Sequence, residues 1–127
     1  MQIYQSQTAK PIDRFVDDLD QSASARGFLI HNNDTMSMAH SFGLHGAHVA
    51  EDFDLHMIQI CKPEKACKSL SKNPERAVLM QKFVMTFSDN GSTQIRFLHY
   101  RPETVRDLID DTEFPESLAA SFAEIID

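Results

Sequence analysis

The sequence predicts an α+β fold, a two-layer sandwich in which helices cover one face of a mixed, mostly antiparallel sheet. A hairpin turn at residues 89–92, which contains Asn90-Gly91, separates strand-like segments at 83–87 and 94–100 and supplies an antiparallel pair. A helical segment that begins at Pro11 separates two earlier strand-like segments, and this crossover is expected to join parallel strands.

The elements follow from apolar periodicity and from the residues that begin and end helices. Leu55 to Cys61 is typical of a strand, and Pro63 directly after it is typical of a helix start. Phe83, Met85 and Phe87 alternate with smaller or polar residues, which indicates a sheet with one face covered by helices. The chain order is therefore a strand at 2–7, a helix at 11–26, a strand at 28–31, a short helix near 36–42, a strand at 55–61, a helix from 63, a turn or short helix from 74, the hairpin, and closing helices at 102–109 and 115–126.

Length and composition predict one domain, residues 1–127, in the cytoplasm. The chain has 127 residues, of which 42% are hydrophobic, enough for one core without staples. Its N-terminal residues lack the pattern of a secretory signal, and no apolar run approaches the roughly 20 residues that span a bilayer, so no membrane partner is expected. With only two cysteines, a disulfide scaffold is not expected.

The charge pattern favours a small anion over a nucleic acid as a partner. The net charge is −7, whereas binding to a duplex requires clustered lysine and arginine. Residues 62–82 nevertheless hold six of the twelve basic residues against two acidic ones. A local basic patch on an acidic protein suits a small anion or an acidic partner, and the alternative is a solvated helix face.

A set of short motifs resembles the domain of unknown function 302 family. That family typically has Gly-Phe after its first helix, Cys-Asn-Pro before a helix with Ala and Leu, and then a Pro. The matching residues here are Gly27-Phe28, Cys61-Lys62-Pro63, Ala66, Leu70 and Pro74. The resemblance implies a compact α/β sandwich that pairs as a homodimer, and it implies no particular activity. The second cysteine of the family is replaced here by Lys82.

A thiol, an imidazole and a cation form the first candidate site. Cys61 precedes a helix N-terminus, where the helix dipole together with Lys62 and Lys65 favours the thiolate. If neighbouring strands end side by side, Cys61, His99 and Lys82 share a pocket suited to nucleophilic chemistry or to holding an anion. The alternatives are that Cys61 is a small buried residue and that His99 is a hydrogen-bonded core histidine.

Four histidines form the second candidate site. His40, His45 and His48 lie within nine residues and His56 follows on a strand, so they could meet around a metal ion or contact a haem. The sequence has none of the paired zinc motifs, and the alternative is that these histidines are surface or capping residues. No cofactor is otherwise predicted.

Three functions remain open at this point. The first is a homodimeric binding module that holds a small anion or metabolite at the start of the helix at residue 63, through Lys62, Lys65 and Lys82. The second is a thiol-dependent enzyme or redox sensor that uses Cys61 with His99. The third is a histidine-based metal- or haem-binding protein. The sequence does not decide whether the protein is an enzyme.

Overall fold

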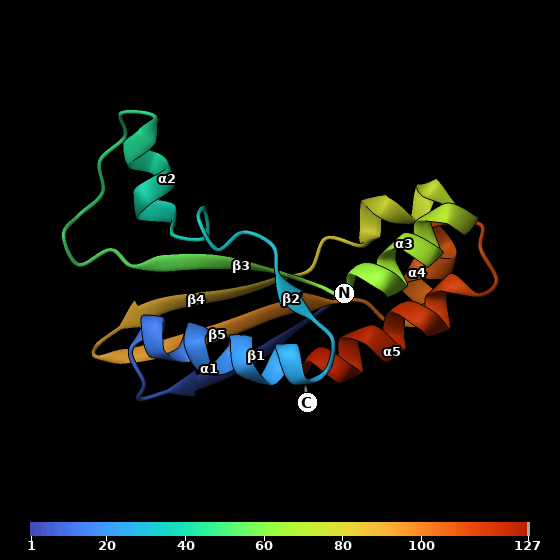
Figure 1. The fold of residues 1–127 in the computed structure, drawn as a ribbon, viewed down its shortest axis with the longest axis horizontal. Helices are drawn as coiled ribbons and strands as arrows, with labels where there is room; N and C mark the ends of the chain where they lie inside the picture. The colour runs from blue at the N-terminus through green and yellow to red at the C-terminus, as the bar shows by residue number, and fades with distance from the viewer. Residues whose placement is uncertain (127) are drawn as a thin grey trace.

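The computed structural model describes residues 1–126, which form a five-stranded sheet and a set of helices (Figure 1). The strands are β1 (Gln2–Thr8), β2 (Leu29–Ile30), β3 (Leu55–Cys61), β4 (Phe83–Asp89) and β5 (Ser92–His99). The helices are α1 (Ile12–Ala25), α2 (Met38–Leu44), α3 (Pro63–Lys72), the 3₁₀ helix η1 (Pro74–Leu79), α4 (Pro102–Leu108) and α5 (Phe114–Ile126). The predicted α+β sandwich is confirmed.

The strand order is β1-β5-β4-β3-β2, and every neighbouring pair in it is antiparallel. The sheet is therefore antiparallel throughout rather than mixed. The strands on either side of α1, β1 and β2, run in the same direction, as expected for a crossover, but they lie at opposite edges of the sheet. The crossover does not create a parallel pair because three antiparallel strands separate its two ends.

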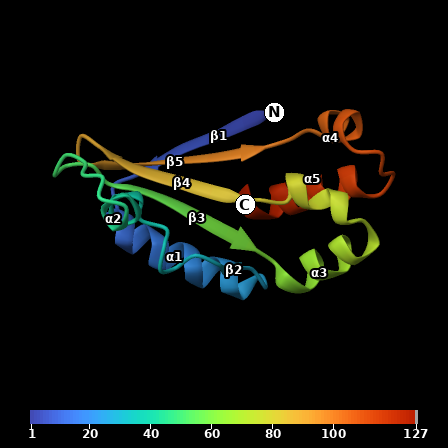
Figure 2. The same cartoon turned by 90° about the horizontal axis from the view of Figure 1, so that it is seen from above.

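One face of the sheet packs against α1 and α5, while α3, η1 and α4 gather at one end of the strands (Figures 1 and 2). Ile58, Val84 and Phe97, from three adjacent strands, are almost fully buried on the covered face. Leu118 and Phe122 of α5 belong to the same core. Thus α5, although last in the chain, packs against the strands in the middle of the sheet.

The covered face of β4 is the opposite of the one that its aromatic residues indicate. Val84 and Thr86 are buried, whereas Phe83, Met85 and Phe87 are half-buried on the uncovered face. Cross-strand register explains this difference, because Val84 lies opposite the core residue Phe97, and side chains at paired positions lie on the same face. Side-chain size alone did not indicate which face the helices cover.

Local backbone geometry fits the residues at the two turns that the sequence highlights. Asn90 and Gly91 both have positive φ, at 51° and 83°, as a two-residue hairpin turn of the primed type requires. Gly27 also has positive φ, 83°, and ends α1 before Phe28 enters the core. In contrast, α2 is capped by Ser37, whose side chain accepts a hydrogen bond from the His40 N–H. Within residues 1–126, the helices are all too short or too polar to cross a lipid bilayer.

Candidate functional site

A cavity of about 280 Å³ opens where β3 ends and α3 begins. Its wall comes from five parts of the chain: the residue before β2, the end of β3, the inner side of α3, η1 with its connection to β4, and α5. The residues that line it include Phe28, Cys61, Lys62, Lys65, Ala66, Leu70, Met80, Lys82, Phe114, Leu118 and Ser121. Cys61 and the three lysines of the predicted anion site therefore line one cavity.

α3 begins at Pro63, directly after β3 ends, and its first turn contributes Lys65 and Ala66 to the cavity wall. Proline is favoured at the first helical position because its missing N–H would have no partner there. The residue before it, Lys62, makes no side-chain capping bond, so no side chain closes the N-terminus of α3. The first N–H groups of this helix therefore have no side-chain cap, and two residues of its first turn, Lys65 and Ala66, line the cavity.

Lys62 and Lys65 are both engaged by α5. The Lys62 Nζ is 3.1 Å from Glu124 Oε1 and lies 5.1 Å from the centre of the Phe28 ring. The Lys65 Nζ donates to Ser121 Oγ at 2.6 Å and to the Ser117 carbonyl at 3.3 Å. These two ammonium groups thus serve first to attach α5 to α3.

Lys82 differs from both. Its side chain is buried, with 9% of its surface exposed, yet no hydrogen bond or ion pair to its ammonium group is present within residues 1–126. Burial lowers the pKa of Lys82; the nearby Cys61 opposes this effect, and Lys65 adds to it. The position of Lys82 is fixed through its backbone, because its carbonyl accepts the Ile60 N–H at 3.0 Å. Lys82 therefore contributes to this cavity a side chain that is nine-tenths buried and an ammonium group without a protein partner among residues 1–126.

Cys61 does not have the lowered pKa that the sequence suggested. Burial raises the pKa of the Cys61 thiol, and the positive charge of Lys82 only partly opposes that effect. Loss of hydration penalises the thiolate more than the neighbouring charges stabilise it. The half-buried Cys61 corresponds more closely to the alternative of a small packed residue.

His99 lies outside the cavity. Its ring stacks on Phe97, at 6.3 Å between centres, and also contacts Phe122 at 5.9 Å. Burial lowers the pKa of His99, and the amino group of Met1 lowers it further. The expected meeting of Cys61, Lys82 and His99 is thus wrong for His99. His99 lies on β5, whereas the cavity lies at the end of β3, and β4 separates these two strands.

The four histidines do not come together. His40, His45 and His48 are exposed on and after α2, which stands apart from the other helices beside β3 (Figure 1). His56 is half-buried, with its Nε2 3.2 Å from Asp54 Oδ1. Across residues 1–126, no three histidine, cysteine or acidic side chains are placed to hold one metal ion. His40, His45 and His48 fit surface histidines, whereas His56 is a half-buried strand residue paired with Asp54.

Part of the basic segment 62–82 is neutralised by acidic residues in the connection between α4 and α5. Arg76 and Asp111 form a buried bidentate pair, with N–O distances of 2.6 and 2.9 Å, and Arg76 holds the pKa of Asp111 well below its usual range. Lys72 pairs with Glu113 at 3.4 Å. Sequence reasoning missed these partners, together with Ser121, because they lie 35 or more positions away and carry no local motif.

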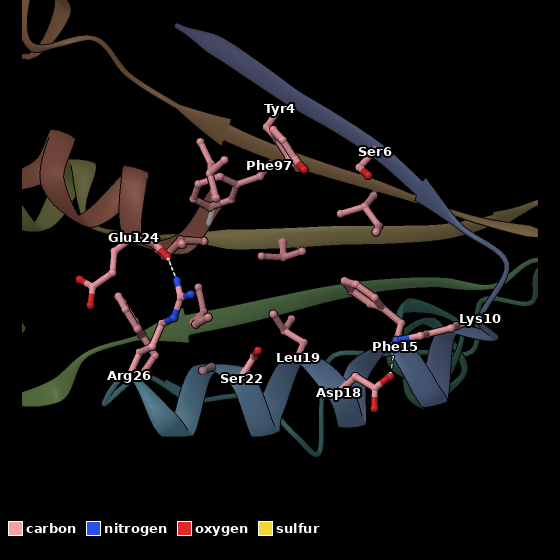
Figure 3. Close-up of a pocket in the computed structure, with 17 residues that line it drawn as sticks. Tyr4, Ser6, Lys10, Phe15, Asp18, Leu19, Ser22, Arg26, Phe97 and Glu124 are labelled. Carbon is pink, nitrogen blue, oxygen red and sulfur yellow. Dashed lines mark hydrogen bonds and ion pairs between the residues drawn. The ribbon is translucent and has the colours of Figure 1, made fainter.

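A second cavity, of about 290 Å³, lies between α1 and the sheet (Figure 3). Its walls are mainly apolar, and the charged groups at its ends are already paired. The Arg26 guanidinium donates to the Glu124 carbonyl at 3.0 Å, and the Lys10 ammonium contacts Asp18 at 2.5 Å. The charged side chains at this cavity thus already have partners among residues 1–126, a carbonyl for Arg26 and a carboxylate for Lys10, which makes the Lys82 cavity the better candidate site.

Among the comparisons with known proteins, a similarity to a solved structure supports the fold described above. No family model matches the sequence, and no match was found among curated proteins. A solved structure, described as an uncharacterized conserved protein DUF302 from Bacillus stearothermophilus, is similar, with a TM-score of 0.76 and 16% identity. The chain resembles a DUF302 protein. The similarity covers 98% of this chain and 92% of the other, so the predicted resemblance to the domain of unknown function 302 family is confirmed as a resemblance of fold.

Proposed function

We propose that this protein is a binding module that holds a small anion or anionic metabolite in the Lys82 cavity. Lys82 carries this proposal, because its side chain is nine-tenths buried at the cavity wall and its ammonium group has no partner within residues 1–126. A charged group that has lost part of its hydration favours a counter-ion, and an anion in the cavity would supply one. The uncapped N-terminus of α3 supports the same ligand class, because its N–H groups and dipole favour a negative charge.

The size and walls of the cavity limit the ligand. About 280 Å³ lies at the lower end of the range for small-molecule sites, which favours a ligand of a few heavy atoms over a nucleotide. Phe28, Phe114 and Leu118 give the cavity an apolar side, so the ligand can carry a short carbon skeleton beside its anionic group. Lys65, already bonded to Ser121, contributes positive charge without having to leave its partner.

Thermal unfolding with a series of anions tests this proposal. Phosphate, sulfate and acetate are each added at one constant ionic strength, with chloride as the reference anion. A bound anion at 100 times its Kd stabilises the folded state by about 2.7 kcal/mol, which a melting curve resolves readily. The shift should be absent in Lys82→Met and remain in Lys68→Met, a matched control at an exposed lysine of the same basic segment. Equal shifts in both variants, or none in the wild type, would defeat the proposal.

We further propose that the module is a homodimer that pairs through the uncovered face of the sheet. On this face Ile3 and Leu98 are 60% and 44% exposed, and three half-buried residues of β4 lie beside them. Exposed apolar surface of this extent on adjacent strands is typical of a protein contact. Sedimentation equilibrium of the wild type and of Leu98→Lys tests this pairing. A wild type that stays monomeric at high concentration would exclude it.

A further inference from the structure

Lys82 differs from the other lysines of the chain in having a free amine inside a cavity. Lys10, Lys62 and Lys72 pair with carboxylates, Lys65 bonds to α5, and Lys68 is exposed. Lys82 is the one lysine in residues 1–126 that is both buried and without a hydrogen-bond or ion-pair partner. Its nitrogen is therefore accessible from the cavity without first breaking a protein contact.

The surroundings of Lys82 favour the neutral amine more than a surface position would. Burial lowers its pKa, with a further contribution from the ammonium of Lys65. A lysine in such surroundings is a better nucleophile toward a carbonyl carbon, because a larger fraction of it is unprotonated at neutral pH. Lys65 itself stays bonded to Ser121 and is not equally available.

We infer that Lys82 forms a reversible imine with a small 2-oxo acid bound in this cavity. This inference rests on the proposed anion site, and it names the class of metabolite. The carboxylate would occupy the anion position near the first turn of α3 and Lys65. The adjacent carbonyl carbon would then lie next to the Lys82 nitrogen, while the short carbon chain would face Phe28 and Leu118.

The step balances without another reactant. The Lys82 ammonium first releases one proton to water, and the lone pair of the amine forms a bond to the carbonyl carbon. The carbonyl oxygen takes up two protons and leaves as water, and the nitrogen keeps a positive charge in the protonated imine. One ammonium and one carbonyl thus become one protonated imine and one water. The Lys65 ammonium keeps a positive charge near the carboxylate while Lys82 is neutral, and the protonated imine restores the second positive charge.

Reductive trapping tests the inference directly. The intact protein is incubated with pyruvate or glyoxylate and sodium cyanoborohydride, which converts an imine to a stable secondary amine. Mass spectrometry of the whole chain should show a single adduct, and peptide mapping should place it on Lys82. Acetate, which fits the anion position but has no carbonyl able to form an imine, should protect against trapping.

Lys82→Arg separates this inference from the anion site on which it rests. Arginine keeps the positive charge but does not form the imine, so acetate should still raise the melting temperature while trapping is lost. Wild-type protein that binds acetate but gives no adduct, or gives adducts spread over exposed lysines such as Lys68, would overturn the imine and leave the anion site standing. If acetate also fails to bind, both fall together.

Discussion

Replacing Lys82 by methionine should stabilise the protein, although the residue lies in the candidate site. The Lys82 side chain is only 9% exposed, and its ammonium group has no partner in residues 1–126 to offset the part of its hydration that burial removes. Methionine has a similar length and needs no partner. Relief of such a cost at a functional position typically contributes about 0.5–2 kcal/mol. For 127 residues, a gain of 1–2 kcal/mol corresponds to a rise in Tm of roughly 3–8 °C.

Lys65→Met is the matched control, because it removes an ammonium group from the same cavity. Here the 2.6 Å bond to Ser121 Oγ is lost, and Ser121 is itself buried at 5% exposure. An unpaired buried hydroxyl costs about 1–3 kcal/mol, so Lys65→Met should lower the Tm. Denaturant unfolding without added anions, followed by circular dichroism, measures both variants. If both substitutions destabilise the protein equally, the reasoning about Lys82 is refuted.

The pH dependence of the unfolding free energy of the wild type and of Lys82→Met gives a second check. Because the folded pKa of Lys82 is lowered, the unfolded chain binds more protons between that value and the unfolded pKa of about 10.4. The wild type therefore gains stability as the pH rises through this window, and Lys82→Met does not. The advantage of Lys82→Met over the wild type should shrink toward pH 10. An advantage that is constant with pH would contradict the assignment.

Three further predictions concern the surroundings of the site. Gly27→Ala should lower the unfolding free energy by about 1–2 kcal/mol, since a φ of 83° is strained for any residue with a Cβ; a denaturant midpoint that does not change would contradict this. The wild type should lose stability as the pH falls below about 4, because Arg76 depresses the folded pKa of Asp111. Asp111→Asn should be less stable at pH 7 and should lack that part of the acid dependence. Unfolding free energies of the two proteins that fall in parallel as the pH is lowered would refute this prediction. In a Cys67→Ser background, the alkylation rate of Cys61 should rise with a midpoint above the value of about 8.5 for free cysteine; a midpoint below 7 would restore the thiolate hypothesis.

The sequence predicted the fold class and the hairpin because these depend on local signals. Alternation in the strands, Asn90-Gly91 at the turn and Pro63 at a helix start all act within a few residues. The sheet order could not be predicted with the same success, because it depends on which distant strands pair. The alternation in β4 likewise did not indicate which of its faces is covered, since the partner strand decides this.

The candidate site was predicted in part. Lys62, Lys65 and Lys82 were placed together from the basic segment and the helix start, and the structure brings all three to one cavity. Their different roles could not be predicted, because Glu124 and Ser121, which engage two of them, come from α5 at the far end of the chain. A charge count treats three lysines alike, whereas burial and pairing distinguish them.

Nuclear magnetic resonance of the backbone amides during a phosphate titration tests the central claim most directly. If an anion sits between Lys82 and the first turn of α3, the N–H signals of Glu64 and Lys65 should shift together and saturate. The same signals should stay in place in Lys82→Met at equal ionic strength. Small changes scattered over exposed residues, without saturation, would mean that the Lys82 cavity does not hold an anion.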